Sequence, residues 1–202
     1  MIAVVYDVKS PIAAKVADEL EGKGWKVIRK AYGEVDVAMD KGCESADLLV
    51  IHADVCDAPS DENADIVGAF MTDRIYDIHK LVQGYVPLLY KGDLKRIALI
   101  SERESSVRLC REKTGYARHM LLAGINMKFK MLFNKYRQEG FTIRCFALAS
   151  EEAKAGEWNA GEGISPVEYM LLDFSNTPED VPMHSEENNF VMRNKWFEEV
   201  EW

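Results

Sequence analysis

Short apolar runs alternate with longer amphipathic segments along the first two thirds of the chain. The runs are rich in β-branched residues and predict buried parallel strands at 2–6, 25–28, 35–38, 47–51, 95–100 and 141–148. The intervening segments carry apolar residues every third or fourth position and predict helices at 11–22, 66–90 and 114–138. Strands that alternate with helices form right-handed β-α-β units. The pattern therefore predicts an α/β fold: a three-layer, doubly wound, Rossmann-like parallel sheet of six or seven strands.

The pattern weakens beyond residue 150, where apolar runs become rare. Ser165 and Pro166 begin a predicted short helix that ends at Leu172, and 189–192 is predicted as an edge strand. No internal repeat or low-complexity segment divides the chain. A length of 202 residues suits one domain, so we expect a single domain over 1–202 with a less regular part at 150–202.

Composition and charge exclude several classes of function. The net charge is -9, with Lys and Arg scattered among more numerous acids, which argues against a nucleic-acid partner. The sequence has no apolar run of about 18 residues, so we expect no membrane span. The start of the chain, 1–6, is predicted to be a strand and not a signal peptide. The four cysteines have neither C-x-x-C nor zinc-ligand spacing, so we predict no metal site and a reducing, cytoplasmic location.

Four segments stand in an order that is typical of one family. They are the strand, turn and helix at the N-terminus, Asp36-Val37 at the end of the predicted third strand, 47–50 followed by 51–54, and 115–117 before a long helix that leads to 140–144. The helix end at 86–89 and the tail 189–202 also fit. In this order and spacing, over nearly the whole chain, the sequence resembles the short-chain dehydrogenase/reductase family. The resemblance implies a nicotinamide-dinucleotide site at the carboxyl ends of the strands, where such sheets bind ligands.

The family's cofactor turn, T-G-x-x-x-G-x-G, is replaced here by 6–13, Tyr-Asp-Val-Lys-Ser-Pro-Ile-Ala. Glycines in this turn let the backbone approach the pyrophosphate, and none remains. Asp7 adds a negative charge and Pro11 removes an amide donor. Lys9 and Ser10 are the side chains left to contact a phosphate. The alternative is an ordinary capped helix start.

The resemblance implies further cofactor contacts after the later strands. Arg29 and Lys30 follow the second strand, where a basic residue suits a 2′-phosphate, so a bound dinucleotide is expected to be NADP rather than NAD. The alternative is two solvated charges at a strand end. Asp36, Val37 and Ala53 match other cofactor-contact positions. His52, beside Ala53 in the segment that replaces the family's Asn-Asn-Ala-Gly, is either a general acid or base or a hydrogen-bonded strand-end residue.

Most of the family's catalytic tetrad of Asn, Ser, Tyr and Lys is replaced. Tyr116 matches the Tyr that transfers the substrate proton. Met120 stands one helical turn later, where the resemblance implies the Lys whose charge lowers the Tyr pKa. Without that Lys, Tyr116 is a neutral phenol at pH 7 and a poor proton relay. Lys113 precedes the helix and is not expected to substitute for it.

The Ser and Asn of the tetrad have no clear counterpart. The Ser position falls on Glu102 or Arg103, with Ser101 and Ser105 as near misses, and the Asn position falls near Arg74. We take Tyr116 and Ser101 as the catalytic candidates. The charged segment 101–106 is unusual for a site that receives a nicotinamide and argues against ordinary hydride transfer.

Three functions remain open at this point. The favoured hypothesis is a degenerate family relative without ordinary dehydrogenase activity, which acts as a binding or interaction protein, with a small molecule as one candidate ligand. The alternative is an active NADP-dependent oxidoreductase that reduces a small carbonyl substrate at a rearranged site around Tyr116. The third is an unrelated Rossmann-like protein of the flavodoxin or nucleotide-binding kind.

The two long helices also predict a partner. In the family, two central helices often form a four-helix interface across a two-fold axis. Helices 66–90 and 113–138 are long and apolar on more than one side, and the second carries Met120, Leu121, Leu122, Ile125, Met127, Phe129, Met131 and Leu132. We therefore expect a homodimer built on these helices. The alternative is that these residues only cover the sheet.

Overall fold

The computed structural model describes residues 1–36, 43–53, 55, 57–60, 63–148, 165–173 and 189–202, and it contains one sheet of seven strands. Their order across the sheet is β2-β1-β3-β4-β5-β6-β7. The strands are β1 (Ile2–Tyr6), β2 (Lys26–Lys30), β3 (Leu48–His52), β4 (Arg96–Ser101), β5 (Thr142–Ala147), β6 (Met192–Arg193) and β7 (Glu199–Val200). Neighbouring strands pair in parallel except β7, which is antiparallel to β6. The predicted parallel α/β sheet is confirmed.

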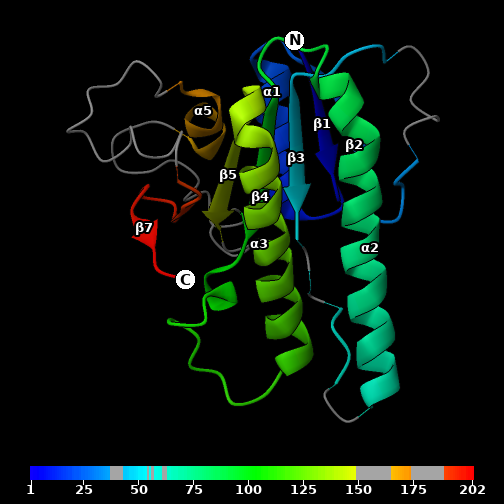
Figure 1. The fold of residues 1–202 in the computed structure, drawn as a ribbon, viewed down its shortest axis with the longest axis vertical. Helices are drawn as coiled ribbons and strands as arrows, with labels where there is room; N and C mark the ends of the chain where they lie inside the picture. The colour runs from blue at the N-terminus through cyan, green and yellow to red at the C-terminus, as the bar shows by residue number, and fades with distance from the viewer. Residues whose placement is uncertain (37–42, 54, 56, 61–62, 149–164, 174–188) are drawn as a thin grey trace.

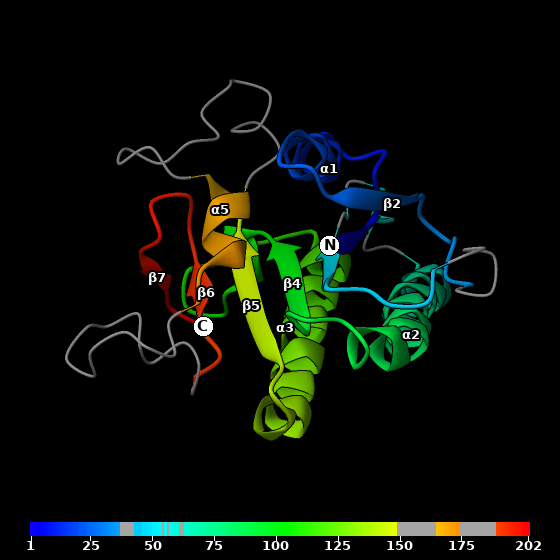
Figure 2. The same ribbon diagram turned by 90° about the horizontal axis from the view of Figure 1, so that it is seen from above.

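Helices cover both faces of this sheet (Figures 1 and 2). On one face lie α1 (Pro11–Gly22) and α5 (Pro166–Leu171), and on the other lie α2 (Ala64–Leu89) and α3 (Tyr116–Tyr136). Two short 3₁₀ segments, η2 (Arg103–Ser105) and η3 (Arg137–Glu139), follow β4 and α3. Each face has its own hydrophobic core, so the predicted three layers are confirmed. No helix in the described part of the chain is long and apolar enough to cross a membrane.

Two predicted strands differ from the structure. Val35 and Asp36, the described part of the predicted strand 35–38, belong to no strand; residues 37 and 38 lie outside the described residues. The physical reason is a turn after β2, in which Gly33 takes the left-handed conformation with φ 81° and Glu34 N–H donates to Ala31 O. Near the C-terminus, the strand predicted at 189–192 is shorter and lies at Met192–Arg193, as β6. The antiparallel hairpin that joins it to β7 was not predicted.

The connection between α2 and β4 lies against the start of β3. The buried carboxylate of Asp47 accepts hydrogen bonds from Ile2 N at 2.7 Å and from Asp93 N at 2.8 Å. Beside it, Ala46 N–H donates to Leu88 O at 3.1 Å. Gly92 passes so close to this strand that a Cβ atom would lie 1.9 Å from the Ala46 carbonyl oxygen. This close approach requires glycine at position 92.

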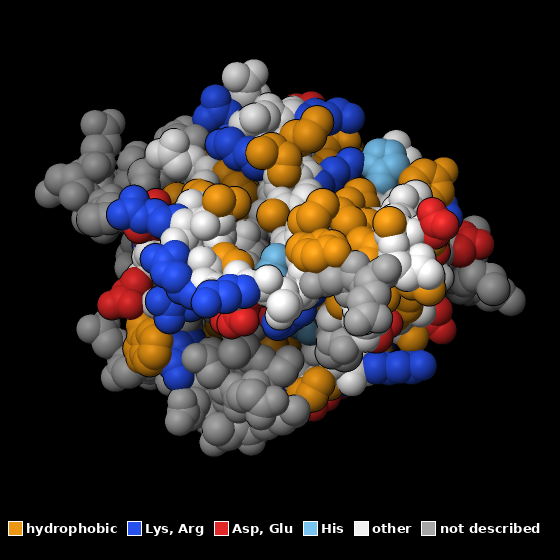
Figure 3. Space-filling model, turned by 90° about the horizontal axis from the view of Figure 1, so that it is seen from below, with side chains coloured by type: hydrophobic (Ala, Val, Ile, Leu, Met, Phe, Trp, Pro, Cys, Tyr) orange, Lys and Arg blue, Asp and Glu red, His pale blue; other side chains and the backbone are white. Residues whose placement is uncertain are grey.

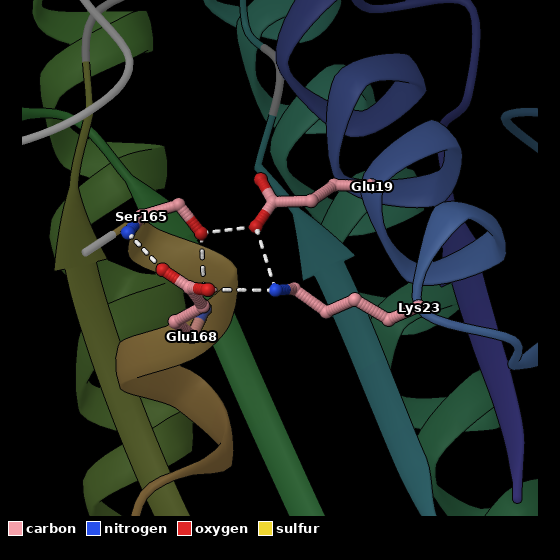
Figure 4. Close-up of polar contacts among 4 residues, drawn as sticks. All are labelled: Glu19, Lys23, Ser165 and Glu168. Atoms are coloured by element: carbon pink, nitrogen blue, oxygen red, sulfur yellow. Dashed lines mark hydrogen bonds and ion pairs between the residues drawn. The ribbon is translucent and has the colours of Figure 1, made fainter. Parts of the chain in front are cut away.

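Polar contacts hold α5 at both ends. Ser165 and Glu168 form a capping box at its N-terminus, and Figure 4 shows both residues facing Glu19 and Lys23 of α1. Lys23 Nζ lies 2.7 Å from Glu168 Oε1, and Ser165 Oγ donates to Glu19. The predicted helix start at Ser165 is confirmed.

The C-terminus of α5 is held by two buried arginines of the sheet. Arg96 of β4 donates to Met170 O at 2.8 Å and to Leu172 O at 2.9 Å. Arg144 of β5 donates to Tyr169 O at 2.5 Å and to Leu172 O at 2.7 Å. The last carbonyls of a helix have no partner within the helix and carry partial negative charge, so cations stabilise them. These contacts explain how a six-residue helix is held on the sheet.

Candidate functional site

The strands β1, β3 and β4 end side by side at the lower edge in Figure 1, the carboxyl edge of the sheet. The strand order reverses between β1 and β3, because α1 leads from β1 to one side of the sheet and α2 leads from β3 to the other. Open α/β sheets bind their ligands at such a reversal. Seen from this side, hydrophobic side chains gather in the middle of the surface and Lys and Arg along one flank (Figure 3).

The turn after β1 is closed around a buried carboxylate. Asp7 has a left-handed backbone, with φ 69°, at the position where the family's turn has its first glycine. Its amide and that of Val8 both donate to Lys30 O, at 2.8 and 3.1 Å, so neither points out to a ligand. The Asp7 side chain is only 8% exposed. The turn therefore has a buried acid at the position where the family's turn has a glycine.

Three further polar side chains are buried near the ends of these strands. His52 ends β3, and its Nδ1 lies 3.7 Å from Asp7 Oδ2. Within the described residues, His52 Nδ1, Ser10 Oγ and Ser101 Oγ have no hydrogen-bond partner. Ser10 occupies the N-cap position of α1, but its side chain makes no capping bond, which corrects the prediction of a hydroxyl cap. Buried polar atoms without partners are costly, so the ends of β1, β3 and β4 are a candidate ligand site.

The basic residues after β2 are already engaged by the protein. Arg29 lies on the sheet side nearest α1 and contacts Asp18 and Glu21, at 2.5 and 2.9 Å, and these carboxylates raise its pKa. Lys30 is buried, and its Nζ donates to the backbone oxygen of Asp36 at 2.9 Å. Lys9 is exposed on the turn after β1. Val37 lies outside the described residues.

Beside the edge, the long helix α2 contributes a cation, Arg74, near the position where the family has the Asn of its tetrad. The guanidinium of Arg74 lies 3.6 Å from the centre of the Tyr32 ring, and Arg74 Nη2 donates to both carboxylate oxygens of Asp57 at 2.5 Å. This arrangement joins α2 to the loops after β2 and β3. The charge of Arg74 is therefore paired within the protein.

The candidate catalytic residues differ sharply in exposure. Tyr116 begins α3 and its residue is 51% exposed, with Met120 exposed one turn later. Ser101 ends β4 and is completely buried, so no substrate oxygen reaches its hydroxyl in this structure. Glu102, at the family's Ser position, forms an ion pair with Arg118 of α3. The structure therefore shows no arrangement in which Tyr116 and Ser101 hold one carbonyl group together.

Two other residues at this edge have structural roles. Ala53 is buried, and its amide donates to Ile100 O at 2.9 Å. Burial raises the pKa of Tyr6 to about 12, and its hydroxyl accepts a hydrogen bond from Gly33 N at 2.9 Å. Tyr6 is consequently a neutral phenol at physiological pH and does not substitute for Tyr116 as a proton relay.

Sequence reasoning missed the partners of these side chains. The contact between Asp7 and His52 joins residues 45 positions apart, and only the sheet register places them together. The stack of Arg74 on Tyr32 had no sequence signal. Arg96 of β4 and Arg144 of β5 did have a sequence signal, because each stands in a predicted strand whose other residues are mostly apolar.

The residues present do not fit a dinucleotide pyrophosphate. A buried Asp7 carboxylate stands at the turn, its neighbouring amides are bonded to Lys30 O, and Pro11 has no N–H. The candidate selector Arg29 is paired with two acids of α1. A phosphate at this position would meet a negative charge with few free donors.

Comparisons with known proteins identify the fold. No family model matches the sequence, and no curated protein matches it. A carbonyl reductase from Pseudomonas aeruginosa PAO1 has a similar structure, with a TM-score of 0.70, 12% identity and coverage of 100% of this chain and 99% of that chain. The same reductase in complex with NADP has a TM-score of 0.69 and 11% identity, and the match covers 100% of this chain and 99% of that chain. A short-chain dehydrogenase from Shigella flexneri has a TM-score of 0.67 and 14% identity, and the match covers 96% of this chain and 90% of that chain. The chain thus has the Rossmann-like fold of the short-chain dehydrogenases and reductases, as the sequence predicted.

Proposed function

We propose that this protein is a short-chain dehydrogenase/reductase-like binding protein that does not carry out ordinary hydride transfer. The observation that carries the proposal is the buried carboxylate of Asp7 in the turn that would receive the cofactor phosphates. The presence of Met120 one turn after Tyr116 supports it, because the family's Lys, which assists proton transfer by the Tyr, is missing there. The fold of the family is retained, while the cofactor turn and the pairing of Tyr with Lys are both altered.

We expect no binding of NADPH or NADP to the wild-type protein up to about 1 mM, measured by calorimetry and by NADPH fluorescence. The Asp7→Gly variant removes the charge, and Gly accepts the left-handed backbone, so we expect it to bind NADPH at least about tenfold more tightly than the wild type. Asp7→Asn removes the charge but keeps the side chain and tolerates this backbone, so it separates the charge from the bulk.

Two outcomes would contradict the proposal. Micromolar binding of NADPH by the wild type is the first. The second is turnover of a panel of small carbonyl compounds that is lost in Tyr116→Phe. That result would favour the alternative, an NADP-dependent reductase, since a carbonyl reductase of similar structure binds NADP. Circular dichroism on every variant confirms that a loss of binding is not a loss of structure.

We further propose that the binding partner includes a second copy of the chain, docked on α2 and α3. Of the apolar residues expected to form this interface, Leu121, Leu122, Ile125, Phe129 and Leu132 are buried in the core. Met120, Met127 and Met131 stay exposed, and their spacing of seven and four places them along one side of α3. Tyr76 of α2 is 55% exposed. Exposed apolar side chains gathered on two packed helices favour an interface.

We expect size-exclusion chromatography with light scattering to show a dimer at high micromolar concentration. The double variant Met120→Glu, Met131→Glu should raise the dimer dissociation constant by about tenfold or more, because two like charges meet their symmetry mates. Gly22→Glu adds a charge at an exposed position of α1, on the other face of the sheet, and is the control. A monomeric wild type would reject the interface.

The remaining expectations are proposals of the same kind. One cooperative unfolding transition is expected for a single domain over 1–202. A cytoplasmic location is supported by the free thiols of Cys43, Cys110 and Cys145.

A further inference from the structure

A cavity of about 410 Å³ lies on the flank of α3, between this helix, the chain after η2 and the C-terminal segment. Its walls are mainly apolar and include Val107, Met127, Phe190 and Trp202, the last two stacked with ring centres 5.3 Å apart. Small-molecule sites typically have about 300–1,000 Å³ and apolar walls with a few polar groups. Asp7, His52 and Ser101 are not among the described residues that line this cavity.

A buried amide contributes one of the cavity's polar groups. Asn126 is 2% exposed, and its Nδ2 donates one hydrogen bond, to Ser105 Oγ at 2.7 Å. The Ser105 hydroxyl in turn donates to Glu102 O at 2.5 Å, which fixes the direction of this chain of bonds. An amide nitrogen has two N–H groups, and within the described residues the second has no acceptor. A ligand oxygen would satisfy it.

The second polar group is a cation one helical turn away. Lys130 lines the cavity four residues after Asn126, so both side chains lie on one face of α3. Its ammonium lies 5.0 Å from the Phe133 ring, and it pairs with no carboxylate among the described residues. Among the described residues that line the cavity there is no Asp or Glu, although acids outnumber bases in the chain. Lys130 is therefore the only charged side chain of the described lining.

We infer that this cavity binds a small apolar monocarboxylate. The hydrocarbon part packs against Phe190, Trp202 and Met127, and the carboxylate accepts hydrogen bonds from Lys130 and from the unused N–H of Asn126. The ligand class follows from complementarity, since a neutral hydrocarbon would leave both donors without an acceptor and a dianion would exceed the single positive charge. The inference does not depend on the absence of dinucleotide binding, and the cavity shares only Met127 with the interface proposed on α3.

The test is a calorimetric titration of the full chain with octanoate and, separately, with 1-octanol. We expect octanoate to bind with a dissociation constant on the order of 100 µM and 1-octanol to bind at least about tenfold more weakly. Lys130→Met keeps the aliphatic stem and should weaken octanoate about tenfold while leaving 1-octanol unchanged. Ala123→Phe places a ring in the cavity and should abolish both. Lys135→Met, on an exposed part of the same helix, is the matched control.

Each other outcome overturns the inference. Absence of octanoate binding at about 5 mM would show that the cavity takes no such ligand. Equal affinity of the wild type and Lys130→Met for octanoate would show that Lys130 does not bind the carboxylate. Binding that survives Ala123→Phe would place the ligand elsewhere. If octanoate binds only below the concentration at which the chain dimerises, the cavity belongs to the interface with a second copy. NADPH enters none of these measurements.

Discussion

We expect Arg144→Met to lower the free energy of unfolding by about 3–4 kcal/mol. The substitution keeps an apolar stem of similar length but removes the donors to Tyr169 O and Leu172 O. Hydrogen bonds from a charged group contribute about 1.5–3 kcal/mol each, and a buried carbonyl left without its partner adds to the loss. For a chain of this size the melting temperature should fall by roughly 10 °C, measured by circular dichroism. Chymotrypsin should also cleave faster after Tyr169, because α5 is held less firmly.

The matched control is Arg111→Met. Arg111 also donates to backbone carbonyls, those of Arg108 and Cys110, but it is exposed. Its loss should change the stability by less than about 0.5 kcal/mol. Equal melting temperatures for Arg144→Met and the wild type would show that α5 does not depend on the buried guanidinium.

Gly92→Ala is expected to destabilise the protein by about 3 kcal/mol or more. The added Cβ would lie 1.9 Å from the carbonyl oxygen and 2.7 Å from the carbonyl carbon of Ala46. Both atoms belong to the backbone of the segment leading into β3, so relief requires the α2-β4 connection to move and the hydrogen bonds of Asp47 to stretch. Overpacking of this kind costs about 1–3 kcal/mol where side chains can yield, and more where they cannot. Urea unfolding with a constant m-value measures it.

Gly68→Ala provides the opposite expectation in the same chain. Gly68 lies inside α2, and a Cβ there would meet nothing within 4 Å. Alanine favours the helix over glycine by about 1 kcal/mol, so this variant should be more stable than the wild type. If Gly92→Ala and Gly68→Ala were equally stable, the close approach of Gly92 to Ala46 would not require glycine.

The sheet was predictable because its strands are buried on both faces. Runs such as 48–51 and 97–100 are continuously apolar, and the helices between them keep their period over many residues. The wrong predictions fall on short segments. Val35 and Asp36 follow a left-handed Gly33 that turns the chain, and the two-residue strands β6 and β7 have no period to detect.

The candidate site was predictable in position but not in its contacts. The carboxyl edge follows from the alternation of strands and helices, and Asp7, His52 and Ser101 were all visible there as residues. Their burial and the engagement of Arg29 by α1 depend on distances across the fold. The family resemblance implied that Tyr116 and Ser101 share one site, whereas Tyr116 is exposed and Ser101 is buried.

The position of β2 has a consequence for the behaviour of the protein in concentrated solution. In the described part of the chain no strand lies beyond β2, so its outer row of backbone N–H and C=O groups faces outward. Open sheet edges invite pairing with other chains and hence aggregation. Lys26 and Arg29 of β2 are exposed, and charged side chains on an edge strand disfavour its pairing with a second chain. These two side chains thus protect the open edge and help to keep the protein dispersed at high concentration.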